Sequence, residues 1–132
     1  MRFLIVEDDL TSRLILQKSL ADYGECVATV NGIEAVQAFK MAMQEKRPYD
    51  LICMDIMMPD MDGQEALQNI RRLEKELQVP ADREVRVVMT SALDDPQNVI
   101  EAMYEGGATD YLVKPLSRSS ITGVLRKLKL IH

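Results

Sequence analysis

The residues of this sequence whose types and spacing could do chemistry together are several carboxylates and one lysine. Asp55 closes the apolar run Leu51-Ile-Cys-Met, and a short loop containing Pro59 and Gly63 follows it. Residues 51–54 are apolar without interruption, as expected for a strand that is buried on both faces of a parallel sheet. We therefore expect Asp55 at the carboxyl end of a central strand, where open α/β sheets bind their ligands.

Polar residues also follow the other apolar runs of the chain, namely Glu7, Asp8, Asp9, Thr90, Ser91 and Lys114. Because the carboxyl ends of parallel strands meet at one edge of a sheet, we expect these side chains to lie close to Asp55. Three or more acids beside one lysine form a hard, anionic set of oxygens that suits Mg²⁺ better than zinc or copper. Helix capping alone could explain Asp9 or Asp94, but it does not explain four strands that each end in a polar residue of this kind.

Strand-like and helix-like segments alternate along the whole chain. The predicted strands cover 3–6, 26–30, 50–55, 85–90 and 110–113, and the predicted helices cover 10–23, 34–45, 63–77, 96–105 and the region 121–128. Five such pairs predict an α/β fold, a doubly wound, five-stranded parallel sheet with five helices on its two faces. We expect the flavodoxin-like strand order 2-1-3-4-5, a longer loop at 77–84, and an N-cap for the last helix among the serines at 117–120.

Length and charge narrow the class of protein. A chain of 132 residues is expected to form a single domain over 1–132, with no output domain after the fifth helix. The net charge of −5 argues against direct binding of nucleic acid. No apolar run approaches the roughly 20 residues that span a bilayer and no signal peptide is recognisable, so we expect a cytoplasmic protein without membrane contact.

Cys26 and Cys53 are expected to be free thiols, because the intervening first strand would hold them too far apart for a disulfide.

Four motifs, taken in this order at these strand ends, resemble those of response-regulator receiver domains. They are Val6-Glu7-Asp8-Asp9, Asp55-Ile-Met-Met-Pro59 with Asp62-Gly63, Met89-Thr90-Ser91-Ala92, and Tyr111-Leu-Val-Lys114-Pro115. The resemblance covers nearly all of the chain, from residue 3 through the fifth predicted helix. It implies the phosphoacceptor half of a two-component system, a signalling protein that catalyses only its own phosphoryl transfer and a slow autodephosphorylation.

The resemblance also implies a role for each residue at the strand ends. Asp55 accepts a phosphoryl group from the phosphohistidine of a sensor histidine kinase or a histidine phosphotransfer protein. Asp8, Asp55 and the backbone carbonyl of Met57 ligate Mg²⁺, and Glu7 acts through water. Lys114 pairs with the aspartate and then with the phosphoryl oxygens. These roles suit phosphoryl transfer, which depends on positioning and charge neutralisation more than on covalent help from the protein.

A conformational switch is the second implication of the resemblance. Thr90 donates its hydroxyl to a phosphoryl oxygen, Tyr111 turns inward behind it, and the face of the fourth helix, fifth strand and fifth helix changes shape for a downstream effector or a second copy. Ser91 is an alternative hydroxyl, because the stretch from Thr90 to Lys114 is longer than is usual in the family. The extra length is expected in the loop 93–97, as a partner-specific feature.

Met57 presents no polar group that could position a hydrolytic water, so we expect a long-lived aspartyl phosphate. The same residue argues against a phosphatase of the haloacid-dehalogenase type, which needs a general acid two residues after the nucleophile. The acids 7–9 argue against a flavodoxin-type phosphate loop, and the register of the 58–63 loop does not fit an EF-hand. The remaining alternative is a receiver-like interaction module that works without phosphorylation.

Overall fold

The computed structural model describes residues 1–92 and 95–132. Within these residues the strands are β1 (Arg2–Val6), β2 (Glu25–Thr29), β3 (Leu51–Asp55), β4 (Arg86–Ser91) and β5 (Asp110–Val113). The helices are α1 (Leu10–Leu20), α2 (Gly32–Gln44), α3 (Gly63–Glu76), α4 (Pro96–Tyr104) and α5 (Arg118–Lys127), with a short 3₁₀ turn at Ala81–Arg83. The predicted alternation is confirmed. Part of the loop predicted to be partner-specific, residues 93 and 94, lies outside the described residues.

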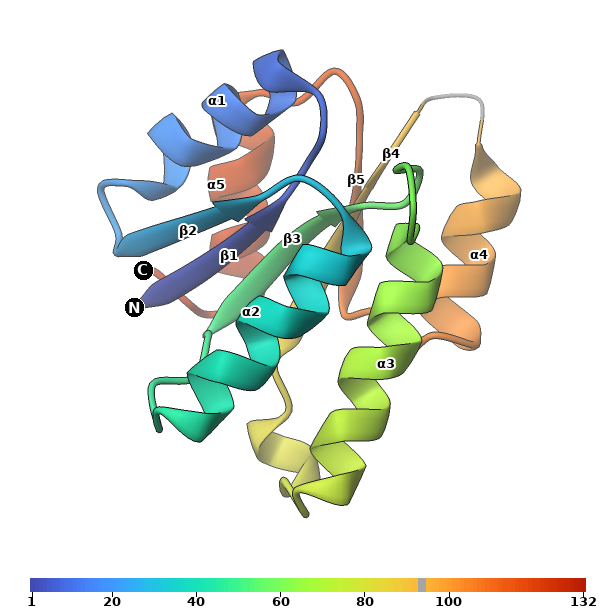
Figure 1. The fold of residues 1–132 in the computed structure, drawn as a ribbon. Helices are drawn as coiled ribbons and strands as arrows, with labels where there is room; N and C mark the ends of the chain where they lie inside the picture. Colours follow the sequence, from blue (N-terminus) through green and yellow to red (C-terminus); the bar gives the residue numbers. More distant parts are fainter. Residues whose placement is uncertain (93–94) are drawn as a thin grey trace.

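The strands form one parallel sheet in the order β2-β1-β3-β4-β5, as predicted. Helices α1 and α5 cover one face of this sheet, and α2, α3 and α4 cover the other (Figure 1). Each described connection leaves the carboxyl end of one strand and returns to the amino end of the next, so the carboxyl ends of the described strands all lie at one edge of the sheet. This edge carries the candidate site.

Alternate residues of the central strands supply the two cores. On β1, Leu4 and Val6 pack with the core under α2, α3 and α4, whereas Phe3 and Ile5 pack with the core under α1 and α5. All of β3 is buried, because helices cover it from both sides. This is why the run 51–55 is apolar until its last residue, and why the single acid there lies in a shielded position.

Side-chain caps fix where the helices begin. The side chains of Asp9, Asn31, Asp62 and Ser117 each accept a hydrogen bond from the backbone N–H three residues later. Ser117 confirms the predicted serine cap. Such caps satisfy backbone donors that a helix leaves free in its first turn. The main difference from the predicted boundaries is α1, which ends at Leu20 because a turn replaces its expected last residues.

Three smaller features complete the fold. Cys26 and Cys53 are free thiols, with β1 lying between their strands as predicted, and burial raises the pKa of Cys53 to about 12. The peptide bond between Lys114 and Pro115 is cis. Among the described helices, none has both the length and the apolar character required to cross a bilayer.

Candidate functional site

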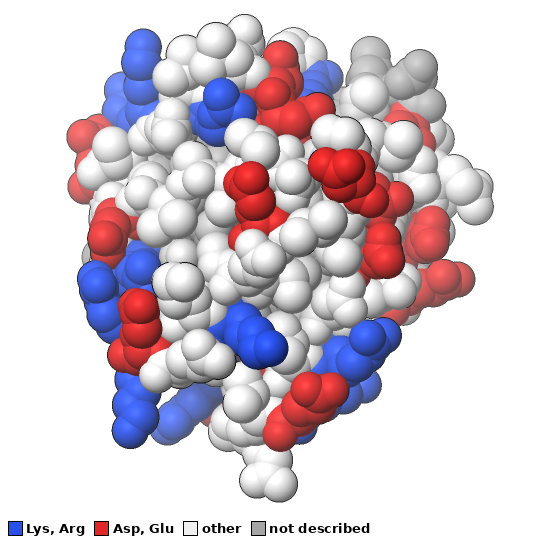
Figure 2. Space-filling view, viewed as in Figure 1, with Lys and Arg blue, Asp and Glu red and all other residues white. Residues whose placement is uncertain are grey.

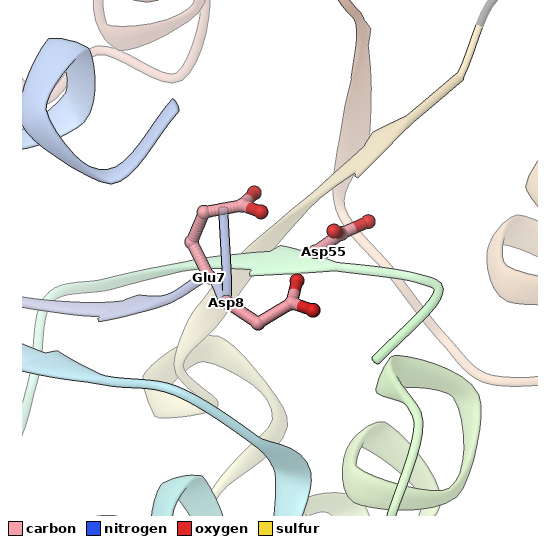
Figure 3. A group of neighbouring side chains, drawn as sticks. All are labelled: Glu7, Asp8 and Asp55. Carbon is pink, nitrogen blue, oxygen red and sulfur yellow. The ribbon is translucent and has the colours of Figure 1, made fainter. Parts of the chain in front are cut away.

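Three carboxylates from two strand ends converge at the carboxyl edge of the sheet. Glu7 and Asp8 follow β1, and Asp55 ends β3; each offers a carboxylate oxygen, and these oxygens all lie within 4.8 Å of one another. Figure 3 shows the three side chains pointing toward a common space. Glu7 and Asp55 are buried and Asp8 is exposed, so the cluster is shielded on the side of Glu7 and Asp55 and open to solvent on the side of Asp8. The sequence predicted this grouping.

Lys114 follows β5 and reaches across to the acids. Its Nζ lies 3.0 Å from Oε1 of Glu7 and 3.1 Å from Oδ2 of Asp55. Burial alone would lower the pKa of Lys114, but the hydrogen bond to Glu7 and the charge of Asp55 outweigh it and raise the pKa. The lysine therefore stays charged and neutralises two carboxylates at once. Its pairing with Asp55 was predicted; its bond to Glu7 was not.

Glu7 has the least favourable environment for a charge among the three carboxylates of the cluster. Its side chain is fully buried, and burial raises its pKa to about 7, with the charge of Asp55 adding to the effect and Lys114 opposing it. One carboxylate oxygen accepts from Lys114 and from the backbone N–H of Asp9. The other oxygen, Oε2, has no hydrogen-bond partner among the described residues. A buried carboxylate oxygen left in this way is costly unless a cation or water meets it, so the donor set fits a divalent cation.

Asp9 does not belong to the cluster. Its side chain caps α1 by accepting from the backbone N–H of Ser12 at 3.0 Å. The hydrogen bonds from Ser12 lower the pKa of Asp9, which keeps this cap ionised. The helix-capping role considered for Asp9 in the sequence analysis is therefore confirmed.

The loop after β3 fixes the position of Asp55. The backbone N–H of Met57 donates to Oδ1 of Asp55 at 3.2 Å, and the N–H of Gly63 donates to the carbonyl of Ile56 at 2.8 Å. A Cβ at Gly63 would lie only 2.2 Å from the carbonyl oxygen of Asp55, so this close approach requires glycine. The side chain of Met57 is 61% exposed and borders the site from solvent. Its carbonyl remains a predicted metal ligand.

Two neighbouring hydroxyls end β4, and both are buried without a hydrogen-bond partner among the described residues. Thr90 is in register with Asp55, and its carbonyl accepts from the N–H of Ile56 at 3.0 Å. Ser91 lines a cavity of about 200 Å³ between β4, α4 and β5, and Tyr111 lines the same cavity. Tyr111 is 43% exposed, so its ring does not fill that space. The lining connects Tyr111 to Ser91 rather than to Thr90.

Acidic side chains gather beside this edge. Figure 2 shows them on the part of the surface where α2 and α3 begin, whereas lysines and arginines are scattered over the rest of this face. Glu34 and Glu65 occupy the first turns of the two helices, and Asp62 caps α3. Carboxylates near helix N-termini stabilise the helices. Together they also make the approach to the site anionic, which favours a cation there.

This fold and this cluster of residues define the class of protein. The family model described as "Response regulator receiver domain" matches residues 3–126. The chain therefore belongs to the receiver family of two-component and phosphorelay systems, whose members are signalling phosphoacceptors.

Individual relatives agree with the family match. The chain is 36% identical to the chemotaxis protein CheY of Bacillus subtilis over 128 residues, which cover 96% of this chain and 95% of that one. A crystal structure of the CheX–CheY–BeF₃–Mg²⁺ complex from Borrelia burgdorferi matches with a TM-score of 0.79 and 30% identity, over 97% of this chain and 89% of that one. The receiver domain of Ssk1, solved with the histidine phosphotransfer protein Ypd1 of Saccharomyces cerevisiae, matches with a TM-score of 0.80 and 27% identity, over 96% and 87%.

Proposed function

We propose that this protein accepts a phosphoryl group on Asp55 from the phosphohistidine of a sensor histidine kinase or a histidine phosphotransfer protein. The observation that carries the proposal is the contact of Asp55 with Lys114 at 3.1 Å inside the cluster with Glu7 and Asp8. A carboxylate so placed is buried enough to be shielded, yet it faces the open side of the cluster. The solved relatives from Borrelia and yeast support this assignment, since one holds BeF₃ with Mg²⁺ and the other a phosphotransfer protein.

Glu7, Asp8, Asp55 and the carbonyl of Met57 are the groups that would hold Mg²⁺. The unpartnered Oε2 of Glu7 and the set of carboxylate oxygens within 4.8 Å support this fit. When bound, Mg²⁺ supplies positive charge against the oxygens of the phosphoryl group being transferred. Its presence would also favour the ionised form of Glu7 and so remove the proton that the buried carboxyl holds below about pH 7.

Lys114 provides charge from the other side of the nucleophile. In the described state its Nζ shares two acids, so it is already held where phosphoryl oxygens would arrive. A carboxylate oxygen of Asp55 attacks phosphorus as the P–N bond to the donor histidine breaks. Meanwhile the N–H of Met57 holds the carboxylate through Oδ1, and Gly63 lets the following loop pack closely against the carbonyl of Asp55. Holding the carboxylate in line in this way supplies most of what phosphoryl transfer needs.

The switch follows from the two hydroxyls and the cavity beside them. A phosphoryl group on Asp55 adds charge and acceptor oxygens next to buried hydroxyls that lack partners. Thr90 is in register with Asp55, and Ser91 lines the cavity that Tyr111 borders. Thr90 is the proposed donor to the phosphoryl group because it is in register with Asp55, and Ser91, which shares the cavity with Tyr111, is the alternative donor. Movement of Tyr111 into the cavity would then reshape the face of α4, β5 and α5 for an effector or a second copy.

Intact-mass measurement after incubation with Mg²⁺ and acetyl phosphate tests the proposal. We expect one phosphoryl adduct on the wild type, none on Asp55→Asn, and none after EDTA treatment. Asp60→Asn, in the same exposed loop, is the matched control and keeps the adduct. Absence of any adduct on the wild type would instead support an interaction module that works without phosphorylation. Thr90→Ala and Ser91→Ala, compared in the same assay, tell which hydroxyl contributes to the rate.

A further inference from the structure

Helix α3 carries a stripe of residues that faces α4. Gln64, Leu67 and Arg71 are spaced three and four residues apart, so they lie on one side of the helix. Gln64 and Leu67 are buried. A Cβ at Gly106, just after α4, would lie 2.7 Å from Leu67, so this end of α4 packs directly on α3. The two ends of the stripe hold α4 by different means.

Near the site, one side-chain hydrogen bond joins the two helices within the described residues. Nε2 of Gln64 donates to the backbone carbonyl of Asn98, in the first turn of α4, at 2.6 Å. Nδ2 of Asn98 in turn donates to Oδ1 of Asp95 at 2.7 Å. Asp95 lines the cavity that Ser91 and Tyr111 share. This hydrogen bond therefore ties the first turn of α4 to α3 beside the cavity proposed to receive Tyr111.

The base of this connection is fixed to the nucleophile. Gly63, the residue before Gln64, donates its N–H to the carbonyl of Ile56 at 2.8 Å and lies against the carbonyl of Asp55. A displacement of the loop after Asp55 therefore moves the start of α3 and the amide of Gln64 with it. Asn98 receives that displacement through one hydrogen bond.

At the opposite end, several hydrogen bonds fix the segment after α4. The guanidinium of Arg71 donates to the carbonyl of Gly107 at 3.0 and 3.2 Å, to the carbonyl of Val85 at 2.8 Å and to Glu74 at 2.7 Å. The second oxygen of Glu74 accepts from the N–H of Val85 at 2.7 Å. This set of charge-assisted hydrogen bonds around the buried Glu74 is far stronger than a single neutral hydrogen bond.

We propose that Gln64 is a positioning residue, a releasable latch that holds the first turn of α4, while Arg71 fixes the far end of α4 as a pivot. A change at Asp55 then displaces the start of α4 and leaves its end in place. The inference rests on the proposed function only for the signal that releases the latch, because the latch itself belongs to the unmodified protein.

Hydrogen exchange in the unmodified protein tests the latch directly. Gln64→Met keeps the length of the side chain and removes the donor. We expect roughly five-fold faster exchange for amides near residue 100 and little change near 106, as loss of one hydrogen bond implies. Gln68→Met, on the exposed side of the same helix, is the matched control. Unchanged exchange, or an equal increase along the whole of α4, would overturn the proposal.

Binding of beryllofluoride with Mg²⁺ separates the two proposals. If the latch stabilises the unmodified arrangement, Gln64→Met should raise the apparent affinity for this phosphoryl mimic by a similar factor. No binding to the wild type would contradict the phosphoacceptor function and leave the exchange result for the latch standing. Binding that is identical in wild type and variant, despite faster exchange, would show that α4 is held by Gln64 but does not respond to Asp55, and would refute the release step.

Discussion

The sheet has an amino edge, where its strands begin, and a carboxyl edge, where they end, and each carries a cation beside a buried carboxylate. Arg71 lies beside Glu74 at the amino edge, and Lys114 lies beside Glu7 and Asp55 at the carboxyl edge, but the hydrogen-bonding needs of the acids are met differently. At the amino edge, each oxygen of Glu74 has a partner, and Arg71 also serves two backbone carbonyls. At the carboxyl edge, Lys114 is shared by two carboxylates, and Oε2 of Glu7 is left without a partner in the described part of the chain. Buried polar groups without partners cost stability. The amino edge therefore holds the fold together, and the carboxyl edge keeps unmet bonding capacity for a ligand.

Removing a partner from the satisfied edge should give the largest loss of stability. Glu74→Ala removes the carboxylate that pairs with the Arg71 guanidinium and leaves the N–H of Val85 without its acceptor, and we expect a loss of about 3 kcal/mol in the free energy of unfolding. Urea denaturation measures it. Glu76→Ala, on the exposed side of α3, is the control and should change stability little. If Glu74→Ala is as stable as the control, the amino edge does not hold the fold together. If Glu74→Ala loses the phosphoryl adduct while remaining folded, the two edges do not have separate roles.

In metal-free protein, the free energy of unfolding should depend on pH because of the buried carboxyl group of Glu7. The folded-state pKa of Glu7, about 7, lies above the ordinary value of 4.5, so the folded protein binds this proton more tightly than the unfolded chain. The resulting stability is fully present below pH 4.5 and is lost as pH rises through 7, by at most ~1.4 kcal/mol per pH unit. Denaturation in EDTA at pH 5 and pH 7.5 should show this decrease.

Glu7→Gln supplies the control for the pH prediction. Glutamine does not titrate, so the decrease between pH 5 and pH 7.5 should become markedly smaller, and the variant should be the more stable protein at pH 7.5 without metal. Added Mg²⁺ should stabilise the wild type more at pH 7.5 than at pH 5, because the proton and the cation compete for Glu7. An identical pH dependence in the two proteins would refute the assignment to Glu7.

The sequence predicted the parts of the fold that depend on runs of residues. The apolar segments ending in Val6 and Asp55 specify buried strands, and the alternation with amphipathic segments specifies a parallel sheet. The grouping of Glu7, Asp8 and Asp55 then followed, because parallel strands end at the same edge. Helix ends were predicted less well, as at the end of α1, since local turns compete there with continuation of the helix.

Contacts between single side chains and distant backbone were not predictable in this way. Gln64 and Arg71 look like ordinary polar positions on a helix, and their partners are carbonyls of Asn98 and Gly107, whose positions only the folded chain determines. The bond between Lys114 and Glu7 was missed for a related reason. The motif pairs the lysine with Asp55, whereas the burial that forces it to neutralise a second acid is a tertiary property.

The smallest expected effect concerns the lifetime of the phosphoryl group. Met57 lies 61% exposed beside Asp55 and offers no polar side-chain group to orient an attacking water. Met57→Asn would supply an amide at this position, and we expect the adduct to decay about five- to ten-fold faster, a change of roughly 1 kcal/mol in the barrier. Following the adduct by intact mass after removal of acetyl phosphate measures the decay. Met41→Asn, an equally exposed methionine on α2, is the control. Equal decay in wild type and Met57→Asn would show that access of water is limited elsewhere, with Lys114 and the hydroxyls of β4 as the next groups to test.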